Sequence, residues 1–570
     1  MKKLITSLIF TLSLGIFAFG QEALKSTEEE YYDFLALSGI VTPPTLGYRT
    51  LSDSVWNISE DAEHVWQENN LGTKKTLWEA SEPFENIFFN GLNQNISLRF
   101  YGPEWYNSYN TLAPYGQNDG ALWQGRGYNT SLTGGLRLEA YGLEVTFKPQ
   151  LSFSQNLDFE LMDNSAYYSN QYAYVWGYGN NIGADAPQRF GDKAFTTFDW
   201  GDSEIRWSWH SFTLGFGNQS PWIGPAWLNP LLHSNNAPSY PKFDIGLRKT
   251  NIPIPFTNLS LGEIETRLWL GKTSESDYFD TNDENNHNYI NGWSFYYAPS
   301  FLPGLSLGFT KVCLIKADTE NWLRYFNPFY DSNRIEDQKM SISFDWIMPK
   351  SGFDFYGEIG VDDYIVGYHE KLTLISTIRN PFHTMTYTFG FKKSMVLSEK
   401  KNLYGEIIFE WDNTEMSKDF QFEWPYNFGF HHQITQGYTN KGQWLGSGIG
   451  YGGNSQIVAF NMIYPKGNTF IFLWRNNPDD NLIYSKTITT DSSNKDVYHR
   501  WYVAYKANMN IGVNSNYFVT KDFSIFAGLV YNMMINPHYN PIKPNENEDF
   551  YLVPVLEHNI QIQLKLKYNF

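Results

Sequence analysis

The sequence predicts an all-β protein: a transmembrane antiparallel β-barrel of the outer membrane, with about 16–18 strands and a small N-terminal helical module. Three observations predict this class. Aromatic residues make up 18% of the chain, although its mean hydropathy is polar, at −0.43. Apolar and polar residues alternate through many segments, and the chain ends on Phe570 at the close of such a segment. A barrel strand is apolar only on its lipid-facing residues, so a hydropathy average hides it.

The first twenty residues have the three parts of a secretion signal. Lys2 and Lys3 form a positive start, an apolar run extends from Leu4 to Phe17, and small residues precede a cleavage point before Gln21. A membrane anchor is the alternative, but the run is shorter than the roughly 20 residues that span a bilayer as a helix. We therefore expect residues 1–20 to be a signal peptide.

The composition argues against several classes of function. A net charge of −18 makes the chain a poor partner for nucleic acid, because such binding rests on neutralising phosphates. Cys313 is the only cysteine, so no disulfide can form within the chain, and we expect Cys313 to be a small apolar residue on a strand. The sequence contains no Gly-rich phosphate loop, nucleophile elbow or zinc helix motif.

Residues 21–80 are expected to form a periplasmic helical module. The stretch "STEEEYYDFLALSG" offers Ser26 or Thr27 as a helix N-cap, has acidic residues in its first turn and ends at Gly39. After a Pro-Pro break, "LSDSVWNISEDAEHVWQEN" has apolar residues at helical spacing. A simple amphipathic hairpin with no role beyond packing is the alternative.

Residues 81–570 are expected to form the barrel with long extracellular loops, and the C-terminal segment is the clearest strand. In "IQIQLKLKYNF" the apolar residues fall on one face and the polar residues on the other, which is period-two alternation. The same pattern recurs in "KMSISFDWIM", "EVTFKPQLSFS" and "LGEIETRLWLGK". A soluble β-sandwich also alternates. Full charges on the polar faces and aromatic residues near strand ends favour a barrel in lipid.

The ends of the predicted strands indicate how the barrel closes and where it lies. A sheet in lipid leaves no edge unpaired, so the last strand is expected to pair with the first. The ending at Phe570 resembles the terminal signature that the bacterial barrel assembly machinery reads. Long polar connections, such as residues 164–193 and 536–549, are expected to be extracellular, and the periplasmic turns short. We expect a monomer surrounded by lipid of the cell outer membrane.

One connection, "WIGPAWLNPLLHSNNAPSYPKF" (residues 222–243), carries large rings and amides that a bare connector does not need. Four prolines fix the backbone, and Gly224 permits a tight turn before Pro225. Aromatic rings bury the C–H faces of sugars, and amides pair with sugar hydroxyls, so the loop is a candidate glycan-binding site. The alternative is an inward-folded constriction or plug loop whose polar groups satisfy one another. The residue chemistry favours neither.

The loop resembles the hallmark segment of the Wzi-like capsule assembly family, in which a W-G-P element precedes a Leu-rich turn and an S-N-N-A-P run. Trp222, Gly224 and Pro225 match the first element, with Ile223 where the family often has a second Trp, and residues 234–238 match the run. Two further stretches are similar to the family, "DQKMSISFDWIMPKSGFDFYGEIGVDD" and "HHQITQGYTNKGQWLGSGIGYGGNSQ". In addition, "YYDFLALSGI" is similar to its short N-terminal helix.

The resemblance implies a lectin-like outer-membrane barrel that binds and anchors capsular or other surface polysaccharide, with no catalysis and no cofactor. A porin or substrate channel of the same architecture is the alternative. Trp222, Trp227 and Tyr240 are predicted stacking platforms, and Asn235 and Asn236 are either readers of sugar hydroxyls or braces of the loop. The full set of predicted ligand-binding residues is Trp222, Trp227, Asn229, Ser234, Asn235, Asn236, Tyr240, Glu358 and Tyr438.

Glycoside hydrolysis is less favoured, and we expect the chain not to be an enzyme. Hydrolysis needs two carboxylates about 5–5.5 Å apart for retention or about 6.5–9.5 Å apart for inversion. Glu263 and Glu265 are expected to share a strand face, but Arg267 on that face favours their ionised forms, and neither is then a proton donor. Glu358 with the acidic pair at residues 362–363 is the other candidate.

No metal site is expected. His431 and His432 are adjacent in the sequence, so on a strand they face opposite ways. His287 lies among acidic residues in "NDENNHNY", which is more typical of a solvated loop with at most weak affinity for Ca²⁺.

Overall fold

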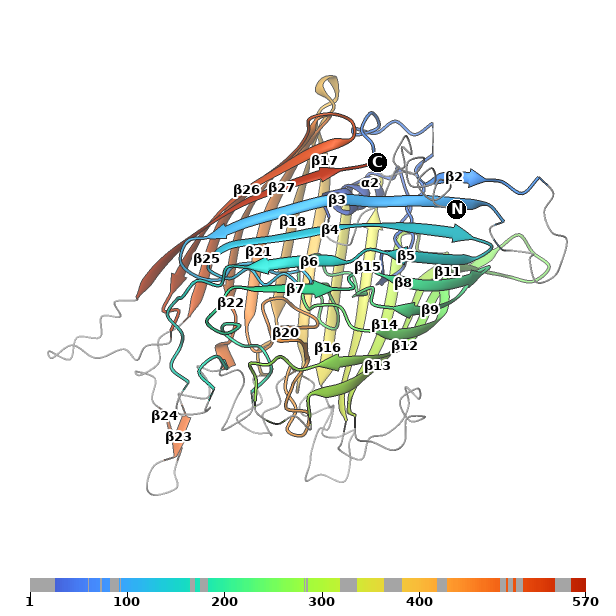
Figure 1. The fold of residues 1–570 in the computed structure, drawn as a ribbon. Coiled ribbons are helices and arrows are strands. Elements are labelled where there is room, and N and C mark those ends of the chain that lie inside the picture. Colours follow the sequence, from blue (N-terminus) through green and yellow to red (C-terminus); the bar gives the residue numbers. More distant parts are fainter. Residues whose placement is uncertain are drawn as a thin grey trace, which may run out of the picture.

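The structure is a computed structural model of the 570-residue chain. It describes residues 26–570 except residues 60, 72–73, 82–91, 93, 165–169, 175–182, 281, 283–284, 318–335, 363–381, 418–427, 482–487, 491–495, 499–505 and 539–554. The described residues close into one antiparallel β-barrel of 18 strand positions (Figure 1). The predicted signal peptide, residues 1–20, and Asp363 lie outside the described residues. None of the described helices has the length and apolar content of a membrane-spanning helix.

The strands of the ring follow one another in chain order. Two positions are each filled by two short strands, because β5 and β6 both pair with β4, while β8 pairs with β5 and β7 with β6. The ring consists of β3 (Ile96–Asn110), β4 (Gly127–Ala140), β5 (Leu143–Phe147), β6 (Gln150–Ser154), β7 (Phe195–Asp199), β8 (Glu204–Trp209), β9 (Phe212–Gly217), β11 (Lys242–Pro253), β12 (Ser260–Ser274), β13 (His287–Pro299), β14 (Leu305–Lys316), β15 (Asp337–Met348), β16 (Phe353–Asp362), β17 (Thr386–Ser398), β18 (Leu403–Asn413), β21 (Asn454–Tyr464), β22 (Gly467–Asn477), β25 (Ala507–Phe518), β26 (Phe523–Ile535) and β27 (Leu556–Tyr568).

Shorter elements accompany the ring. β2 pairs with the start of β3, β1 with β10, β19 with β20, and β23 with β24. The bounds of these elements are β1 (Tyr48–Arg49), β2 (Lys75–Trp78), β10 (Trp222–Ile223), β19 (Thr439–Asn440), β20 (Gln443–Trp444), β23 (Ile488–Thr490), β24 (Asp496–Tyr498) and a 3-10 turn, η2 (Glu399–Lys401).

The last strand closes the barrel. β27 pairs with β3 from Gln561 opposite Asn110 to Lys567 opposite Glu104, so the expected pairing of the last strand with the first is confirmed. The 18 positions fall within the predicted range. Alternation along β27 separates two environments: Ile562 is 55% exposed on the outside, whereas Gln561 is 1% exposed on the inside. The apolar outer face is the surface that membrane lipid covers.

The two ends of the barrel differ in their connections. At one end they are short, such as the turns at residues 141–142, 210–211 and 465–466, and at the other they are long, such as residues 111–126 and 414–453. The C-terminus lies at the short-turn end (Figure 1). Outer-membrane barrels have short turns on the periplasmic side, which assigns this end to the periplasm and the long loops to the cell exterior.

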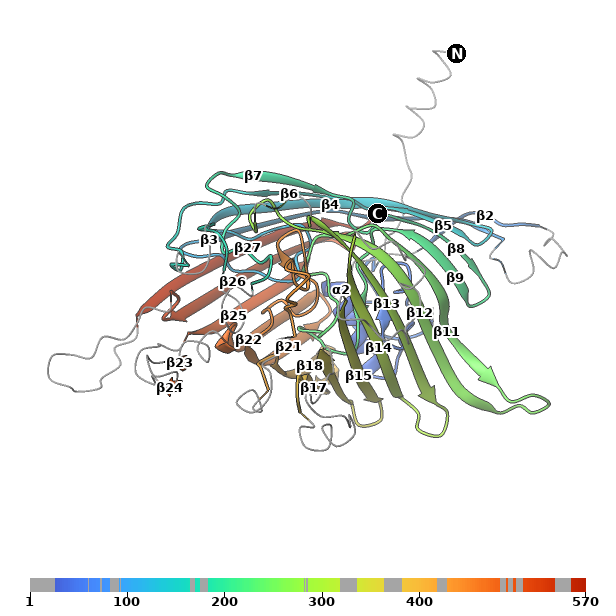
Figure 2. The same ribbon diagram turned by 90° about the horizontal axis from the view of Figure 1, so that it is seen from below.

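The N-terminal segment lies inside the barrel, toward the periplasmic end. α2 (Thr27–Leu37) begins after Ser26, whose side chain accepts a backbone hydrogen bond of 3.1 Å from the first turn, and the acidic residues of that turn suit the positive end of the helix dipole. Tyr31 of the helix packs in a cluster with Trp66 and with Phe518 of β25. Figures 1 and 2 place α2 within the ring of strands.

The second predicted helical stretch, within residues 51–69, is not a helix. The described residues 51–59 and 61–71 form turns and irregular segments, so the prediction of helix there is wrong. The Trp66 ring stacks on that of Tyr31 with centroids 4.0 Å apart, and its Nε1 donates to the Tyr464 carbonyl at 2.9 Å. Packing on the barrel wall, rather than a helical stripe, therefore explains the apolar spacing in this segment.

Several long loops fold into the lumen beside the N-terminal segment. We call these segments together the plug: residues 26–59, 111–126, 183–194, 218–241 and 428–453. The pairing of β1 with β10 joins the N-terminal segment to the loop at residues 218–241. A cluster of buried apolar residues, including Tyr48, Ile223, Leu232 and Tyr438, lies where the plug meets the inner wall. Within the described part of the chain, the largest hydrophobic cluster is therefore inside the barrel.

Candidate functional site

The loop at residues 218–241 rests on carboxylates of the inner wall. Glu410 on β18 accepts hydrogen bonds of 2.6–3.1 Å from three successive backbone N–H groups, those of residues 227–229. Asp412, two residues along the strand, accepts a bond of 2.9 Å from the side-chain amide of Asn229. Together these two side chains hold four donors of residues 227–229, and so they fix the shape of the loop.

Glu358 on β16, a predicted ligand-binding residue, lies beneath the same loop. Its Oε2 accepts from Leu231 N at 3.2 Å, and a Cβ added to Gly224 would lie 2.9 Å from the same oxygen. Gly224 has φ of +90° and donates its N–H to the Gly47 carbonyl at 2.9 Å. Both the lack of space and the backbone conformation therefore require glycine at this turn.

The S-N-N-A-P run joins its loop to other parts of the plug. Ser234 Oγ donates to the Gly446 carbonyl at 2.6 Å, and Asn236 Nδ2 donates to the Trp444 carbonyl at 3.0 Å. Asn236 Oδ1 accepts from Asn118 N at 3.1 Å. These contacts hold three plug segments together, which agrees with the brace alternative for Asn236.

His233 and Tyr240 close the loop on itself. His233 Nε2 lies 2.8 Å from Tyr240 Oη, and His233 Nδ1 lies 2.9 Å from the Ser234 carbonyl oxygen. Burial, with a smaller effect of the nearby Lys242 charge, lowers the pKa of His233 to about 3, so the imidazole is neutral. Tyr240 and Tyr438 are both buried in the cluster where the plug meets the inner wall.

A cavity of about 740 Å³ lies between the plug and the inner wall formed by β22, β25, β26 and β27. Three of the predicted residues line it: Trp227, Asn235 and Asn236. The other six predicted residues are buried and do not line it: Trp222, Asn229, Ser234, Tyr240, Glu358 and Tyr438. The wall of the cavity is rich in amides, among them Asn468, Asn508, Asn514, Asn516, Gln561 and Gln563.

Aromatic rings lie beside these amides. Trp227 contacts Phe470 with ring centroids 5.8 Å apart, and Tyr115 contacts Trp474 at 6.3 Å; all four residues line the cavity. The sequence prediction centred on the loop and missed the amides of the wall. The signal for them is the stretch "ANMNIGVNSNYF", residues 507–518, where asparagines recur on alternate, inward-facing positions.

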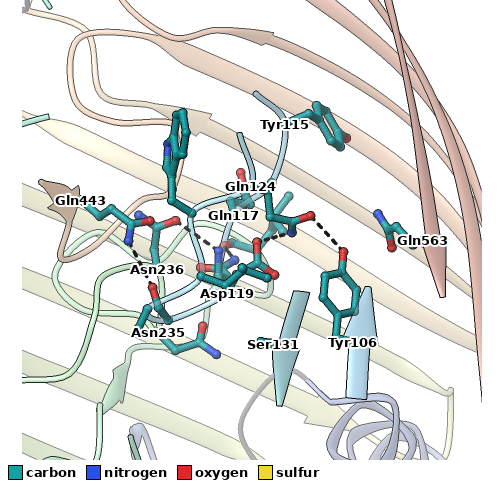
Figure 3. Close-up of a pocket in the computed structure, with 18 of the residues that line it drawn as sticks. Tyr106, Tyr115, Gln117, Asp119, Gln124, Ser131, Asn235, Asn236, Gln443 and Gln563 are labelled. Carbon is teal, nitrogen blue, oxygen red and sulfur yellow. Dashed lines mark hydrogen bonds between the residues drawn. The ribbon is translucent and has the colours of Figure 1, made fainter. Parts of the chain in front are cut away.

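Asp119, on the plug loop at residues 111–126, is an acidic group of this cavity. Gln124 Nε2 donates to Asp119 Oδ2 at 2.7 Å, and Tyr106 Oη donates to Gln124 Oε1 at 3.1 Å (Figure 3). Burial raises the pKa of Asp119 to about 7. The carboxyl group is therefore partly protonated near neutral pH.

Buried ion pairs hold the plug to the wall. Asp53 of the N-terminal segment lies 2.7 Å from Arg248 and 3.0 Å from Arg267, and Glu28 of α2 lies 2.9 Å from Lys567. Removing one partner of such a pair leaves the other charge poorly solvated, which is strongly destabilising.

The carboxylates considered for hydrolysis make structural contacts. Glu265 accepts from the backbone N–H groups of Leu46 and Tyr48 at 2.6 and 2.7 Å. Asp362 lies 2.7 Å from the ammonium of Lys339. These acids therefore help to position the plug and the wall.

One group of side chains in the described residues has the donor set of a metal site. Glu160, His538 and Glu557 bring three ligand atoms within 4.8 Å of one another. His538 Nε2 lies 3.1 Å from Glu557 and 3.8 Å from Glu160, so a hydrogen bond between the imidazole and Glu557 also accounts for the arrangement. His431 Nδ1 accepts the backbone N–H of Ile434 at 3.2 Å and supports a turn.

The fold and the site together define a class of protein. It is an outer-membrane β-barrel whose lumen is occupied by its own N-terminal segment and loops, around a cavity lined by amides and rings. The sequence profile of the family described as "Capsule assembly protein Wzi" matches residues 121–521, and the chain belongs to this family. Its location is the cell outer membrane.

Solved structures agree with this fold. The structure of Wzi from Escherichia coli, an outer membrane protein described as involved in group 1 capsule assembly and as a carbohydrate-binding β-barrel, is 12% identical with a TM-score of 0.57, covering 97% of this chain and 99% of that one. At this identity the likeness shows the fold alone. Two other barrels match less well. Acinetobacter baumannii OccAB1 is 10% identical with a TM-score of 0.35, covering 83% of this chain and 96% of that one. Pseudomonas aeruginosa OprD is 9% identical with a TM-score of 0.37, covering 83% of this chain and 92% of that one, and neither likeness supports an argument. No curated protein matches the chain.

Proposed function

We propose that this protein binds surface polysaccharide of the capsular kind in its lumenal cavity and holds it at the outer membrane without altering it chemically. The observation that carries the proposal is the cavity, where amides of the wall and rings such as Trp227 meet in about 740 Å³. Amides donate to and accept from sugar hydroxyls, and rings bury the C–H faces of sugars. Membership of a capsule assembly family agrees with this class of ligand.

The plug weighs against the porin alternative. A diffusion channel needs an open path through the lumen, whereas the described residues of this barrel fill it with apolar clusters and buried ion pairs. The long loops, α2 and the wall strands all take part in these clusters and ion pairs. The proposal therefore treats the lumen as a binding space rather than a conduit.

The proposal includes no catalytic step. Its support is that the carboxylates most suited by spacing to glycoside hydrolysis are engaged elsewhere: Glu265 by backbone N–H groups and Asp362 by Lys339. A hydrolase needs one carboxyl group free to donate a proton and another free to act as a nucleophile or base.

We also propose that the barrel is a monomer inserted by the barrel assembly machinery. A closed ring leaves no strand edge that requires a partner chain. The terminal Phe570 ring lies at the periplasmic end, with its centroid 5.8 Å from that of Phe100 and 4.9 Å from that of Tyr568. The chain end therefore has an ordered aromatic group for the machinery to recognise.

Calorimetric titration of the purified mature barrel in detergent with isolated capsular polysaccharide tests the proposal. Trp227→Ala removes a ring from the cavity and is expected to weaken binding about tenfold, a change of about 1.4 kcal/mol. Trp411→Ala, on the lipid-facing side of β18, is the matched control and should bind as the wild type does. Equal affinity of the two variants would contradict the lumenal site, and large steady single-channel currents would favour the porin alternative.

A further inference from the structure

Asp119 lies at a fixed point of the cavity, on the plug loop at residues 111–126. The backbone N–H of Gly120 donates to the Asn235 carbonyl at 2.8 Å, which joins this turn to the loop at residues 218–241. Gln150 Nε2 on β6 donates to the Asp119 carbonyl at 3.1 Å, which joins the turn to the barrel wall. The backbone at Asp119 is therefore held from two sides before a ligand enters, so binding there orders little further chain.

One oxygen of the Asp119 carboxyl group is engaged and the other is open. Gln124 Nε2 donates to Asp119 Oδ2 at 2.7 Å (Figure 3). Gln124 keeps this orientation because its Oε1 accepts from Tyr106 and Gln561, at 3.1 and 2.9 Å. Asp119 is half-buried and lines the cavity. Among the described residues its Oδ1 has no hydrogen-bond or ion-pair partner, and protein does not enclose it, so this oxygen is accessible to a ligand.

The cavity carries more acidic than basic side chains. Five acidic and two basic residues line the part of it that the described residues form. Both lysines already have an acidic partner: Lys148 Nζ lies 2.9 Å from Asp202, and Lys565 Nζ lies 3.6 Å from Glu104. Charges inside a cleft with low-dielectric walls act more strongly than they do in water, so this surplus of negative charge repels an anionic ligand.

Tyr115, on the same loop as Asp119, adds apolar surface and a neutral hydroxyl. Its ring packs against Trp474 with centroids 6.3 Å apart, and both residues line the cavity. Burial, with a smaller effect of the Asp119 charge, raises the pKa of Tyr115 above its ordinary value, so the phenol is neutral and can donate or accept. The volume of about 740 Å³ is within the range of about 300–1,000 Å³ for small-ligand sites. The space therefore suits a short segment of a glycan chain.

We infer that Asp119 is the specificity-determining residue of the cavity: its open oxygen accepts hydrogen bonds from hydroxyls of a neutral sugar residue, and acidic sugars are excluded. The inference rests on the proposed function and names the class of sugar. Hydrogen bonds to a carboxylate are roughly twice as strong as those between neutral groups, so this acceptor outweighs any single amide of the wall. The carboxylate of an acidic sugar has no proton to donate and meets a like charge, which neither paired lysine of the cavity is free to offset.

The strength of this contact should depend on pH. Burial raises the pKa of Asp119 to about 7, and no charged side chain of the described residues contributes to the shift. The titratable groups that face Asp119 are the phenols of Tyr106 and Tyr115, which are neutral below about pH 10, and its other partners are amides. Sugar hydroxyls bind the ionised carboxylate more strongly than the protonated form. Affinity for a neutral glycan should therefore be highest above pH 7 and fall as Asp119 takes up its proton.

Calorimetric titration of the full mature barrel in detergent with isolated capsular polysaccharide, at pH 6 and at pH 8, tests the inference. A second titrant is the same polysaccharide after chemical reduction of any carboxyl groups to alcohols, which removes their charge and keeps the glycan backbone. The wild type is expected to bind several-fold more tightly at pH 8 than at pH 6. The reduced polysaccharide should bind at least as tightly as the native form.

Asp119→Asn keeps the shape of the side chain and removes its charge. At pH 8 this variant should bind about tenfold more weakly than the wild type, and its affinity should no longer differ between pH 6 and pH 8. Asp158→Asn is the matched control, because the Asp158 side chain is 90% exposed, lies 2.6 Å from Arg189 and does not line the cavity. This control should keep both the affinity and the pH dependence of the wild type.

Equal affinities of Asp119→Asn and the wild type at pH 8, or the same loss of affinity in Asp158→Asn, would overturn the role of Asp119 and leave the proposed function standing. Weaker binding of the reduced polysaccharide, or wild-type affinity that is the same at pH 6 and pH 8, would overturn it too. These last two measurements need only the wild type, so they decide the matter even if Asp119→Asn does not assemble. If neither form of the polysaccharide binds the wild type at either pH, the proposed function itself is wrong.

Discussion

Asp53 Oδ2 lies 3.0 Å from Arg267 Nη2, and Asp53 Oδ1 lies 2.7 Å from Arg248 Nε. The aspartate belongs to the N-terminal part of the plug, whereas the arginines lie on the neighbouring strands β11 and β12. The contact therefore fastens a segment near the start of the chain to a wall about 200 residues further along. This pairing is a physical reason for the plug to stay in the lumen rather than in the periplasm.

Asp53→Asn is expected to loosen the plug without preventing barrel closure. The change removes the carboxylate charge that Arg267 and Arg248 share. Arg267 keeps Asp244 as a partner and Arg248 keeps Glu144, so the loss of stability should be smaller than the about 3–5 kcal/mol of a fully broken buried pair. Single-channel recordings should then show larger and more frequent currents than the wild type. Glu263→Gln, at a more exposed pair 3.2 Å from Lys249, is the control and should change stability by about 0–1 kcal/mol. Identical recordings from both variants would show that this ion pair does not retain the plug.

Glu410→Gln is expected to release the loop at residues 218–241. The amide keeps the shape of the side chain but removes the charge that three backbone N–H groups share. A hydrogen bond to a charged group contributes about 1.5–3 kcal/mol, so a loss of that order is expected. Protease added to intact cells should cut this loop faster than in the wild type. Glu399→Gln, in the exposed turn η2, is the control, and its loop should be cut at the wild-type rate. Equal rates of cleavage for the two variants would show that Glu410 does not support the loop.

His233 should make the barrel less stable in acid. Its pKa is lowered from 6.5 to about 3, so the unfolded chain takes up this proton well before the folded chain does. The stabilising contribution is complete above pH 6.5 and declines as the pH falls, by about 2 kcal/mol between pH 7 and pH 5. Heat unfolding in SDS at a series of pH values measures it. His233→Gln should flatten this part of the curve, and parallel curves for the two proteins would count against a buried neutral imidazole.

Phe570→Ala should reduce assembly rather than ligand binding. The terminal ring packs on Phe100 and Tyr568 at the periplasmic end and does not line the cavity. Less folded barrel is therefore expected in the outer membrane, as measured by heat-modified mobility on gels. Each folded molecule should bind glycan as the wild type does. Normal amounts of folded protein would show that the terminal ring is not needed for insertion.

The barrel could be predicted from the sequence because alternation is local. The segment at residues 560–570 shows its two faces directly, and the structure places them on the two sides of the wall. The roles of Trp222 and Tyr240 were not predictable in this way. Whether their rings face a ligand or the core depends on Glu358 and Glu410, which fold beneath the loop from strands more than 100 residues away.

For the same reason, the cavity could be predicted from the sequence only in part. The inward direction of Asn514 follows from alternation along β25, but the sequence does not reveal that the loop of Asp119 folds into the lumen opposite β25–β27. The helix predicted around Trp66 does not form, for a related reason. Its apolar spacing is set by contacts with Tyr31 and Phe518, not by a helical repeat.

A high-resolution structure of the barrel with a bound oligosaccharide of the capsular polysaccharide tests the central claim most directly. The account predicts sugar density inside the lumen, against the Trp227 ring and within hydrogen-bond distance of the Asp119 carboxyl group. Density confined to the outer surface of the long loops, with the cavity unchanged, would contradict it.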